Sequence, residues 1–178
     1  KLITDGEKKI VVLSAMSGTT NSLVEISDYF YKNNTSGALE KINSLEQKYY
    51  DVIEDLYSKA DCKAEAKQII KTHFEYLRSF SKSVFTLFEE KAILAQGELL
   101  STAMFQLYLQ EIGENSALLP ALEYMRIDKN AEPDTNYIAE NLALQLEAQP
   151  DKTIYITQGF ICRNIYGEID NLQRGGSD

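Results

Sequence analysis

Hydrophobic residues along this chain form short continuous runs in some places and helical repeats in others. Apolar runs at residues 9–13 and 153–157 are typical of strands buried in a parallel sheet. A shorter run at 117–119 predicts another strand, although Pro120 disfavours a central position for it. Residues 163–171 are polar with one glycine, and we expect a loop or an irregular hairpin there.

Apolar residues recur at helical spacing in the remaining segments, and each such segment predicts a helix with a buried face. The expected helices are residues 22–31, 38–60, 63–80, 88–112 and 135–148. The fourth is apolar on nearly all sides in its second half, so we expect it to be deeply buried. Asp134 is placed to cap the last one. Strands that alternate with helices around a long helical excursion predict an α/β fold with a mainly parallel sheet.

The helical excursion is expected to be a helical hairpin added to the edge of the sheet domain. It covers about residues 36–88 within one partial domain, which spans residues 1–178. Its Tyr and Phe residues are interpreted as packing rather than as a cofactor site. The single histidine, His73, follows the same pattern and is interpreted as packed or solvent-facing.

The composition is ordinary for a soluble globular protein and argues against several functions. The chain has 178 residues, of which 44% are hydrophobic and 25% charged, enough for one domain with a core. The net charge of -9 argues against a nucleic-acid partner. Cys62 and Cys162 are far apart, and no zinc-ligand spacing exists, so we expect no metal-ligating side chains and reduced thiols in the cytoplasm. No apolar run approaches the roughly 20 residues of a membrane span.

Small and hydroxyl residues follow the first predicted strand, at residues 14–21, just before a helix. Backbone N–H groups at a helix N-terminus, together with hydroxyl donors, suit a phosphate or a carboxylate. The segment is not a Walker A loop, because no Gly-Lys-Ser/Thr follows. An ordinary strand-to-helix turn with a Thr or Asn cap is the alternative.

The C-terminal segment combines a buried strand, a turn at Gly159 and the ending RGGSD. Arg174 offers a planar fork for a carboxylate or phosphate. Gly175 and Gly176 can expose backbone N–H groups to an anion. Open α/β sheets usually bind ligands at the carboxyl ends of their strands, which favours a ligand site here over a Gly-rich surface turn.

Glu98 stands at the start of the apolar half of the fourth predicted helix, with Ser101 and Thr102 one turn further on. A carboxylate that enters a core needs a cationic or hydrogen-bonding partner. Glu98 is therefore expected to have such a partner. The alternative is that it marks an exposed shoulder of the helix.

Three separated segments resemble the signature of aspartate kinases, within the amino acid kinase family. They are VVLSAMSGTTN at residues 11–21, QGELLST at 96–102 and ITQGFI…LQRGGSD at 156–178. The resemblance implies the three-layer αβα amino acid kinase fold. It also implies transfer of the γ-phosphoryl group of ATP to the side-chain carboxylate of L-aspartate, the first step toward lysine, threonine and methionine. ATP and Mg²⁺, a cytoplasmic location and a homo-oligomeric full-length protein are implied with it.

The resemblance also implies a substrate pocket. Thr20 resembles the family's hydroxyl at the substrate side chain, and Glu98 resembles its acceptor for the substrate ammonium. Arg174 resembles the fork for the α-carboxylate, and Phe160 resembles a wall of the pocket. The residues expected around that fork are Gly175, Gly176 and Ser177.

On the nucleotide side, Ser14, Ala15 and Gly18 resemble the family's contacts near the phosphates. Asp178 resembles the acidic catalytic residue near the transferring phosphate. The substrate carboxylate has a reference pKa of about 3.9, so it is ionised at pH 7 and needs no general base. Catalysis is then expected to come from positioning and positive charge.

The chain departs from the family pattern at several positions. Cys162 stands where a glycine is usual, Gln173 stands where a glycine usually precedes the arginine, and residues 169–172 replace a Thr-rich run. Pro120 lies near where many relatives carry an aspartate. The lysine-bearing opening strand is missing, as is everything after Asp178, including regulatory ACT domains. We therefore expect no aspartyl phosphate formation by this chain alone.

Two alternatives stay open on the sequence. One is a different amino acid kinase acting on glutamate, acetylglutamate or carbamate, which QGELLST together with RGGSD disfavours. The other is a non-catalytic helical interaction module, which the acidic surface and the long helical hairpin would permit.

Overall fold

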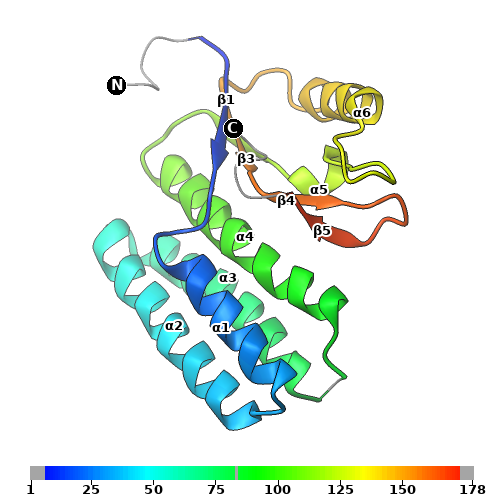
Figure 1. The fold of residues 1–178 in the computed structure, drawn as a ribbon. Coiled ribbons are helices and arrows are strands. Elements are labelled where there is room, and N and C mark those ends of the chain that lie inside the picture. The colour runs from blue at the N-terminus through cyan, green and yellow to red at the C-terminus, as the bar shows by residue number, and fades with distance from the viewer. Residues whose placement is uncertain (1–6, 83, 173–178) are drawn as a thin grey trace.

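Three parallel strands form the centre of the structure, a computed structural model that describes residues 7–82 and 84–172 (Figure 1). The strands are β1 (Lys9–Leu13), β2 (Ser116–Leu119) and β3 (Ile154–Gln158), in the order β1-β3-β2. Their positions confirm the three strand predictions. Pro120 follows the last residue of β2, which is an edge strand of the described sheet, so its missing N–H disturbs no central ladder.

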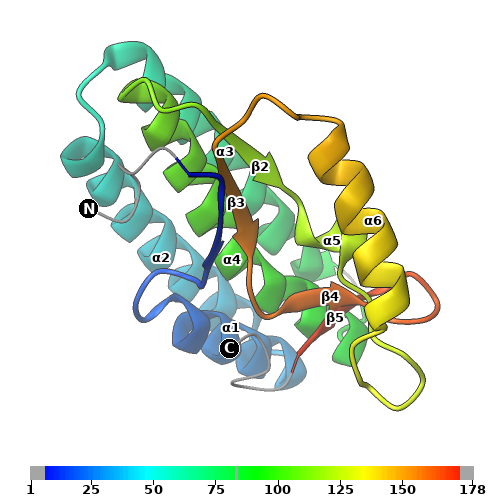
Figure 2. The same ribbon diagram turned by 90° about the horizontal axis from the view of Figure 1, so that it is seen from above.

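Helices cover both faces of this sheet, as Figures 1 and 2 show. One layer contains α1 (Thr19–Tyr31), α2 (Thr35–Leu56), α3 (Ala60–Ser79), the short η1 (Phe80–Lys82) and α4 (Leu87–Glu111). The other face carries α6 (Thr135–Glu147). Along β3, Ile154 and Ile156 pack with Leu109 of α4, whereas Tyr155 packs in the cluster that Leu146 of α6 joins. The arrangement confirms an α/β fold with three layers.

The predicted helices are present, with some ends shifted. The helix expected from residue 22 begins at Thr19, and the one expected to reach residue 60 ends at Leu56. It ends there because the backbone N–H groups of Ser58 and Lys59 donate to the carboxylate of Glu111, at 3.0 and 2.6 Å. This bonding leads the chain away from helical geometry. As predicted, Asp134 caps α6, since its side chain accepts from the backbone N–H of Tyr137.

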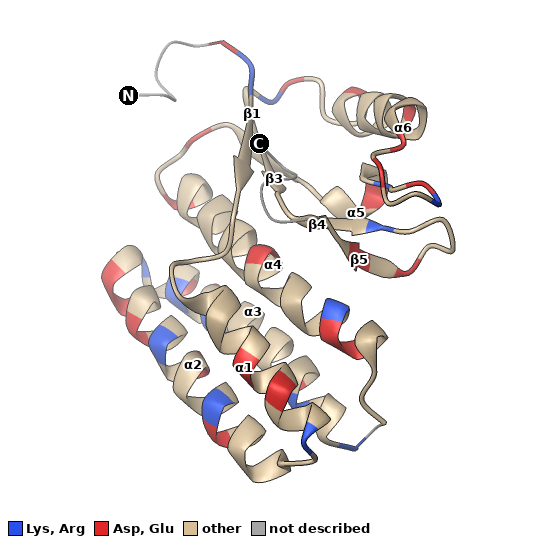
Figure 3. Cartoon of the chain, in the orientation of Figure 1, with Lys and Arg blue, Asp and Glu red and all other residues tan. Residues whose placement is uncertain are grey.

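The helical hairpin α2–α3 packs mainly against α1 and α4, at one side of the helical layer. The reason is the apolar stripe on each of these helices, which closes into one large cluster of buried residues. This cluster includes Leu23, Ile42, Tyr49, Ile70, Phe74, Leu77 and Leu100. The Tyr and Phe stripe of the hairpin is therefore packing, as predicted. Charged residues lie along the outer surfaces of these helices (Figure 3).

The polar segment near the C-terminus is a regular antiparallel hairpin, where we expected a loop or an irregular one. It consists of β4 (Ile161–Arg163) and β5 (Ile169–Asn171), with Cys162 opposite Asp170. Gly167 has a φ of 79° in the connecting turn, a conformation that glycine adopts without strain. A short helix, α5 (Ala121–Tyr124), lies between β2 and α6 in the chain. No helix in the described part of the chain is long and apolar enough to cross a membrane.

Candidate functional site

The loop between β1 and α1 lies at the carboxyl end of the sheet and begins the helix that follows. Gly18 is the N-cap of α1, with a left-handed φ of 78° that suits glycine. Thr19 is completely buried, whereas Thr20 is half-buried in the first turn. The carbonyl of Ser14 accepts a hydrogen bond from Ser101 Oγ at 2.8 Å. The loop is thereby attached to α4.

Glu98 of α4 lies beside this loop and is only 4% exposed. Its Oε1 accepts a hydrogen bond from the backbone N–H of Ala15 at 3.3 Å. Its Oε2 is buried and has no hydrogen-bond partner among the described residues. Burial raises the pKa of the Glu98 carboxyl, although the hydrogen bond from Ala15 opposes the rise. The interpretation as an exposed shoulder is therefore wrong, and the buried carboxylate is suited to accept a ligand ammonium.

Gly97 allows α4 to approach the loop this closely. A Cβ at this position would lie 2.8 Å from the Cβ of Ala15 and 3.5 Å from Cγ2 of Thr19. Contacts under 3.0 Å are essentially absent from real structures. The glycine therefore sets the distance between Glu98 and the loop.

Two adjacent side chains of α2 also hold the loop. Tyr49 Oη lies 3.1 Å from Thr19 Oγ1, and Lys48 Nζ donates to the carbonyl of Ser17 at 2.5 Å. Burial raises the pKa of Tyr49 to about 12, and the charge of Glu98 adds to the rise. Sequence reasoning missed both contacts, because Tyr49 and Thr19 are 30 residues apart and Tyr49 also fits a packing stripe.

The turn after β3 brings Phe160 to the same end of the sheet. The backbone N–H of Gly159 donates to the carbonyl of Leu13 at 2.9 Å, so this turn lies beside the end of β1. Phe160 is half-buried and has a φ of 62°, which is unusual for a bulky residue. The backbone N–H of Leu172 donates to its carbonyl at 2.7 Å, so the chain after β5 also passes here.

Gln158 connects β3 to two helices, a role that sequence reasoning did not assign. Its Nε2 donates to Thr102 Oγ1 and its Oε1 accepts from the backbone N–H of Ala121, both at 2.7 Å. Thr102 Oγ1 in turn donates to the carbonyl of Glu98 at 2.7 Å. Gln158 and Thr102 belong to the ITQGFI and QGELLST segments, which the sequence analysis had singled out. Membership of these segments was the signal that could have identified them.

The structure thus brings the six described candidate residues to one end of the sheet. Those in or beside the β1–α1 loop are Ser14, Ala15, Gly18, Thr20 and Glu98, and Phe160 lies at the exit of the neighbouring strand. The remaining candidates lie outside the described residues. They are Arg174, Gly175, Gly176, Ser177 and Asp178.

His73 is packed between helices, as one of the two interpretations had it. Its Nδ1 lies 2.6 Å from Oε1 of Gln96, the residue that begins the QGELLST segment. Burial lowers the pKa of His73, although the hydrogen bond opposes this. Within residues 7–82 and 84–172, no group of three or more His, Cys, Asp or Glu side chains could hold a metal ion.

Known proteins with similar sequences match this chain over nearly its whole length. A model of the amino acid kinase family matches residues 1–178. Lysine-sensitive aspartokinase 3 of Escherichia coli is 27% identical over 180 residues, which cover 99% of this chain and 39% of that protein. Chloroplastic aspartokinase 1 of Arabidopsis thaliana is 26% identical over 185 residues, covering 97% of this chain and 31% of that protein.

Two solved structures of E. coli aspartokinase III resemble this structure. The R-state complex with aspartate and ADP has a TM-score of 0.75 at 26% identity, over 95% of this chain and 38% of that chain. The T-state complex with lysine and aspartate has a TM-score of 0.79 at 26% identity, over 99% and 40%. The chain therefore spans only about two-fifths of the length of these E. coli relatives.

Proposed function

Because this chain belongs to the amino acid kinase family, we propose that it supplies the amino-acid-binding part of an aspartate kinase. The reaction transfers the γ-phosphoryl group of ATP to the side-chain carboxylate of L-aspartate, giving 4-phospho-L-aspartate. The observation that carries the proposal is the buried carboxylate of Glu98, held 3.3 Å from the backbone N–H of Ala15 at the carboxyl end of the sheet. The E. coli relative crystallised with aspartate and ADP supports both the acceptor and the nucleotide.

The substrate is a zwitterion, and its two backbone charges need opposite partners. Glu98 accepts the α-ammonium, because its Oε2 is buried without a partner among the described residues. Arg174 takes the α-carboxylate with its planar fork. Thr20 offers its hydroxyl to the reacting carboxylate, and Phe160 closes one wall. The pocket thus orients a nucleophile that is already ionised at pH 7.

The nucleotide phosphates are proposed to lie over the β1–α1 loop, near Ser14, Ala15 and Gly18. Gly18 caps α1, and the N-terminus of a helix favours an anion through its N–H groups and its dipole. ATP supplies the phosphoryl group. Mg²⁺ would enter with the phosphates, which are its usual ligands together with one or two carboxylates. Asp178 is proposed to act as the acidic residue near the transferring phosphate.

The wider setting follows from the same proposal. We place the enzyme in the cytoplasm, at the first step toward lysine, threonine and methionine, and as a homo-oligomer in its full-length form. Residues 36–88 are proposed to be a helical insertion in the catalytic domain. The relatives named above are all aspartokinases, which favours aspartate over glutamate, acetylglutamate or carbamate and disfavours a non-catalytic module.

The test is Glu98→Gln in the full-length gene product, assayed by hydroxamate trapping of the acyl phosphate. The amide keeps the shape but removes the charge that holds the ammonium. A lost charge-assisted hydrogen bond of roughly 1.5–3 kcal/mol lowers kcat/KM for aspartate by about ten- to a hundredfold. The KM for ATP should change little. The melting temperature should not fall, because the variant removes a buried charge without a cationic partner.

Two further variants make the result specific. Arg174→Lys keeps the charge but loses the fork, so it should raise the KM for aspartate more than the KM for ATP. Glu75→Gln is the control, because this carboxylate is 63% exposed on α3. A large loss of stability in Glu98→Gln with unchanged aspartate kinetics would show that Glu98 is structural, and the proposal would fail.

A further inference from the structure

Two buried hydrogen bonds connect the end of strand β3 to helix α4, and we call them the Gln158–Thr102 relay. Gln158, the last residue of β3, donates from Nε2 to Thr102 Oγ1 at 2.7 Å. Thr102 Oγ1 donates in turn to the backbone carbonyl of Glu98, one helical turn earlier in α4, also at 2.7 Å. Gln158 is 3% exposed and Thr102 is completely buried, so removing either side chain leaves a buried polar group unpaired.

The direction of each hydrogen bond in the relay is fixed by a third contact. Gln158 Oε1 accepts from the backbone N–H of Ala121 at 2.7 Å, and a backbone N–H can only donate. The amide nitrogen of Gln158 must therefore face Thr102, whose hydroxyl is left to donate to the Glu98 carbonyl. Ala121 begins α5, so a flip of the Gln158 amide would break its contacts with two helices at once.

The relay ends beside two residues of the proposed substrate pocket, both of which the structure describes. Glu98 is proposed to accept the α-ammonium, since its buried Oε2 has no hydrogen-bond partner in the described part of the chain. Phe160, the proposed wall, follows Gln158 by two residues, across the turn at Gly159. The backbone N–H of Gly159 donates to the carbonyl of Leu13 at 2.9 Å, so this turn is fixed to the sheet. A shift of Gln158 relative to α4 would therefore change the distance between Glu98 and Phe160.

We propose that Gln158 and Thr102 are positioning residues that set the distance between Glu98 and Phe160, and through it the affinity for the amino-acid substrate. The inference rests on the proposed function, which assigns Glu98 to the ammonium and Phe160 to the pocket wall. Gln158 and Thr102 act through the backbone of α4 and the turn after β3, without touching the substrate.

The nucleotide side of the site has attachments of its own. Ser101 Oγ donates to the carbonyl of Ser14 at 2.8 Å, and Tyr49 Oη lies 3.1 Å from Thr19 Oγ1 in the first turn of α1. None of these four residues belongs to the relay. Loss of the relay should therefore weaken the binding of L-aspartate and leave the KM for ATP nearly unchanged.

The experiment measures the KM for L-aspartate and the KM for ATP in variants of the full-length gene product. Gln158→Met removes both amide contacts and should raise the KM for L-aspartate about tenfold, the upper end of what one hydrogen bond contributes. The KM for ATP should stay within about twofold. Thr102→Val removes the hydroxyl and should act like Gln158→Met, whereas Thr102→Ser keeps the hydroxyl and should preserve the wild-type KM. The double variant of Gln158→Met with Thr102→Val should resemble the worse single variant, because the two side chains act as one unit.

Gln106→Met is the matched control, because Gln106 also lies on α4 and makes a buried hydrogen bond to the sheet. Its Nε2 donates to Ser116 Oγ at 3.1 Å, and Ser116 begins β2, at the opposite end of the sheet from the site. Loss of this bond should lower the melting temperature without changing the KM for L-aspartate. The Kd for L-aspartate, measured by titration calorimetry, does not depend on turnover and should rise about tenfold in Gln158→Met.

Three results would overturn the inference. An aspartate KM that is unchanged in Gln158→Met and Thr102→Val, or raised equally in Gln106→Met, would show that the relay contributes only to stability. An equal rise in the KM for ATP would show that the relay acts on the whole site. Effects that multiply in the double variant would show that the two residues act independently.

The design also covers failure of a variant or of the proposed function. If Gln158→Met does not fold, the comparison of Thr102→Val with Thr102→Ser decides the inference, and equal aspartate KM values in those two proteins overturn it. If the wild-type protein neither binds L-aspartate nor forms aspartyl hydroxamate, the proposed function itself has failed. The substrate role of the relay then fails with it.

Discussion

The helical layer and the α6 side of the sheet both present apolar side chains for packing, yet they bury those side chains to different degrees. In the helical layer, side chains such as Leu23, Ile70 and Leu77 are completely buried. On the α6 side of the sheet, Ile10 is 45% exposed and Val12 is 53% exposed. A groove of about 450 Å³ lies there between β1 and α6. In α6 itself no residue is buried, and Leu144 is 61% exposed.

This difference in burial indicates that the two layers contribute differently to folding stability and to the geometry of the site. Three amphipathic helices, α1, α2 and α3, can close their apolar stripes on one another and on α4, which is apolar on most sides, so the helical layer has a complete core. A sheet has two faces, and β1 is covered by α4 on one of them, where Val11 and Leu13 pack. We infer that the helical layer supplies most of the folding stability. The sheet layer mainly positions the residues at the carboxyl ends of its strands, where the candidate site lies.

The largest expected effect comes from a matched pair of leucine truncations. Leu77→Ala in α3 removes a fully buried side chain and leaves a cavity, which should cost about 2–5 kcal/mol of unfolding free energy. Leu144→Ala in α6 removes an exposed side chain and should cost less than about 0.5 kcal/mol. Urea denaturation of the purified protein measures both. Equal costs at the two positions would break the comparison between the layers.

The next effect concerns the contact that connects the helical layer to the site. Tyr49→Phe leaves the buried Thr19 hydroxyl without its partner, and we expect a loss of about 1–3 kcal/mol. Thr19→Val combined with Tyr49→Phe removes both polar groups and should recover most of that loss. The double-mutant cycle is read from urea midpoints. If the two single losses simply add, then the hydroxyls are not coupled and the helical layer does not hold the loop through them.

A smaller effect depends on pH and sharpens the same comparison. Burial lowers the folded-state pKa of His73, in the helical layer, below its ordinary value. The unfolded chain then binds more protons, so this contribution to stability is present above the unfolded pKa and is lost as pH falls through that pKa toward the folded one. The slope from one such group is at most about 1.4 kcal/mol per pH unit.

The His73 effect is measured as unfolding free energy from pH 8 down to 5 for the wild type and His73→Gln. The glutamine keeps a donor for Gln96 but does not titrate, so the slope near the ordinary pKa of about 6.5 should be shallower in the variant. Glu98 has a raised pKa and an opposite sign, since its contribution is lost as pH rises. Identical slopes in both proteins would mean that His73 titrates alike in the folded and unfolded states.

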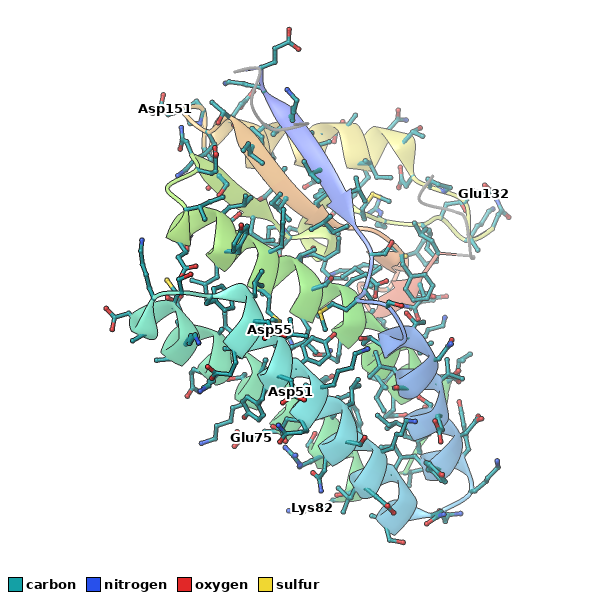
Figure 4. The ribbon with its side chains drawn as sticks, turned by 90° about the vertical axis from the view of Figure 1, so that its left-hand side faces the viewer. Asp51, Asp55, Glu75, Lys82, Glu132 and Asp151 are labelled. Carbon is teal, nitrogen blue, oxygen red and sulfur yellow. The ribbon has the colours of Figure 1, made fainter. Side chains whose placement is uncertain are left out.

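The smallest effect is expected at the outer surface of the helical layer, where Figure 4 shows Glu75. Lys71 Nζ lies 3.9 Å from Glu75 Oε1, and both side chains are more than half exposed. Glu75→Gln should change the unfolding free energy by less than about 0.5 kcal/mol. A thermal melt at low and high salt measures this. A loss comparable with that of Leu77→Ala would show that surface charge, rather than the core, stabilises this layer.

Periodicity in the sequence was enough to predict the five long helices and the three strands of the parallel sheet, because each of these elements buries a face and the spacing of apolar residues records which one. It did not predict β4, β5 or the short helix α5. It did not predict where α2 ends, since that end depends on Glu111, which lies more than 50 residues further along the chain. Nor did it predict that the hairpin would pack on α1 and α4. Amphipathic stripes show that a partner exists but not which one.

The candidate site was partly predictable for a similar reason. Glu98 was identifiable as a charge entering an apolar helix, and the loop after β1 was identifiable from its small residues. The contacts of Tyr49 and Gln158 were not, because their hydrogen bonds form only when distant elements meet, and Tyr49 also fits a packing stripe. The roles proposed for Arg174 and Asp178 remain predictions, as both lie outside the described residues.

Phe160 has a consequence for selection among variants. A phenylalanine at a φ of 62° carries backbone strain of about 1–3 kcal/mol, which glycine would relieve. In a library of all substitutions at this codon, a screen for folded protein alone should therefore enrich glycine. A screen for growth that requires the proposed aspartate kinase activity should deplete it, because the aromatic wall proposed for the substrate pocket would be gone. At position 160, glycine would then be favoured over phenylalanine for stability, whereas phenylalanine would be favoured over glycine for growth.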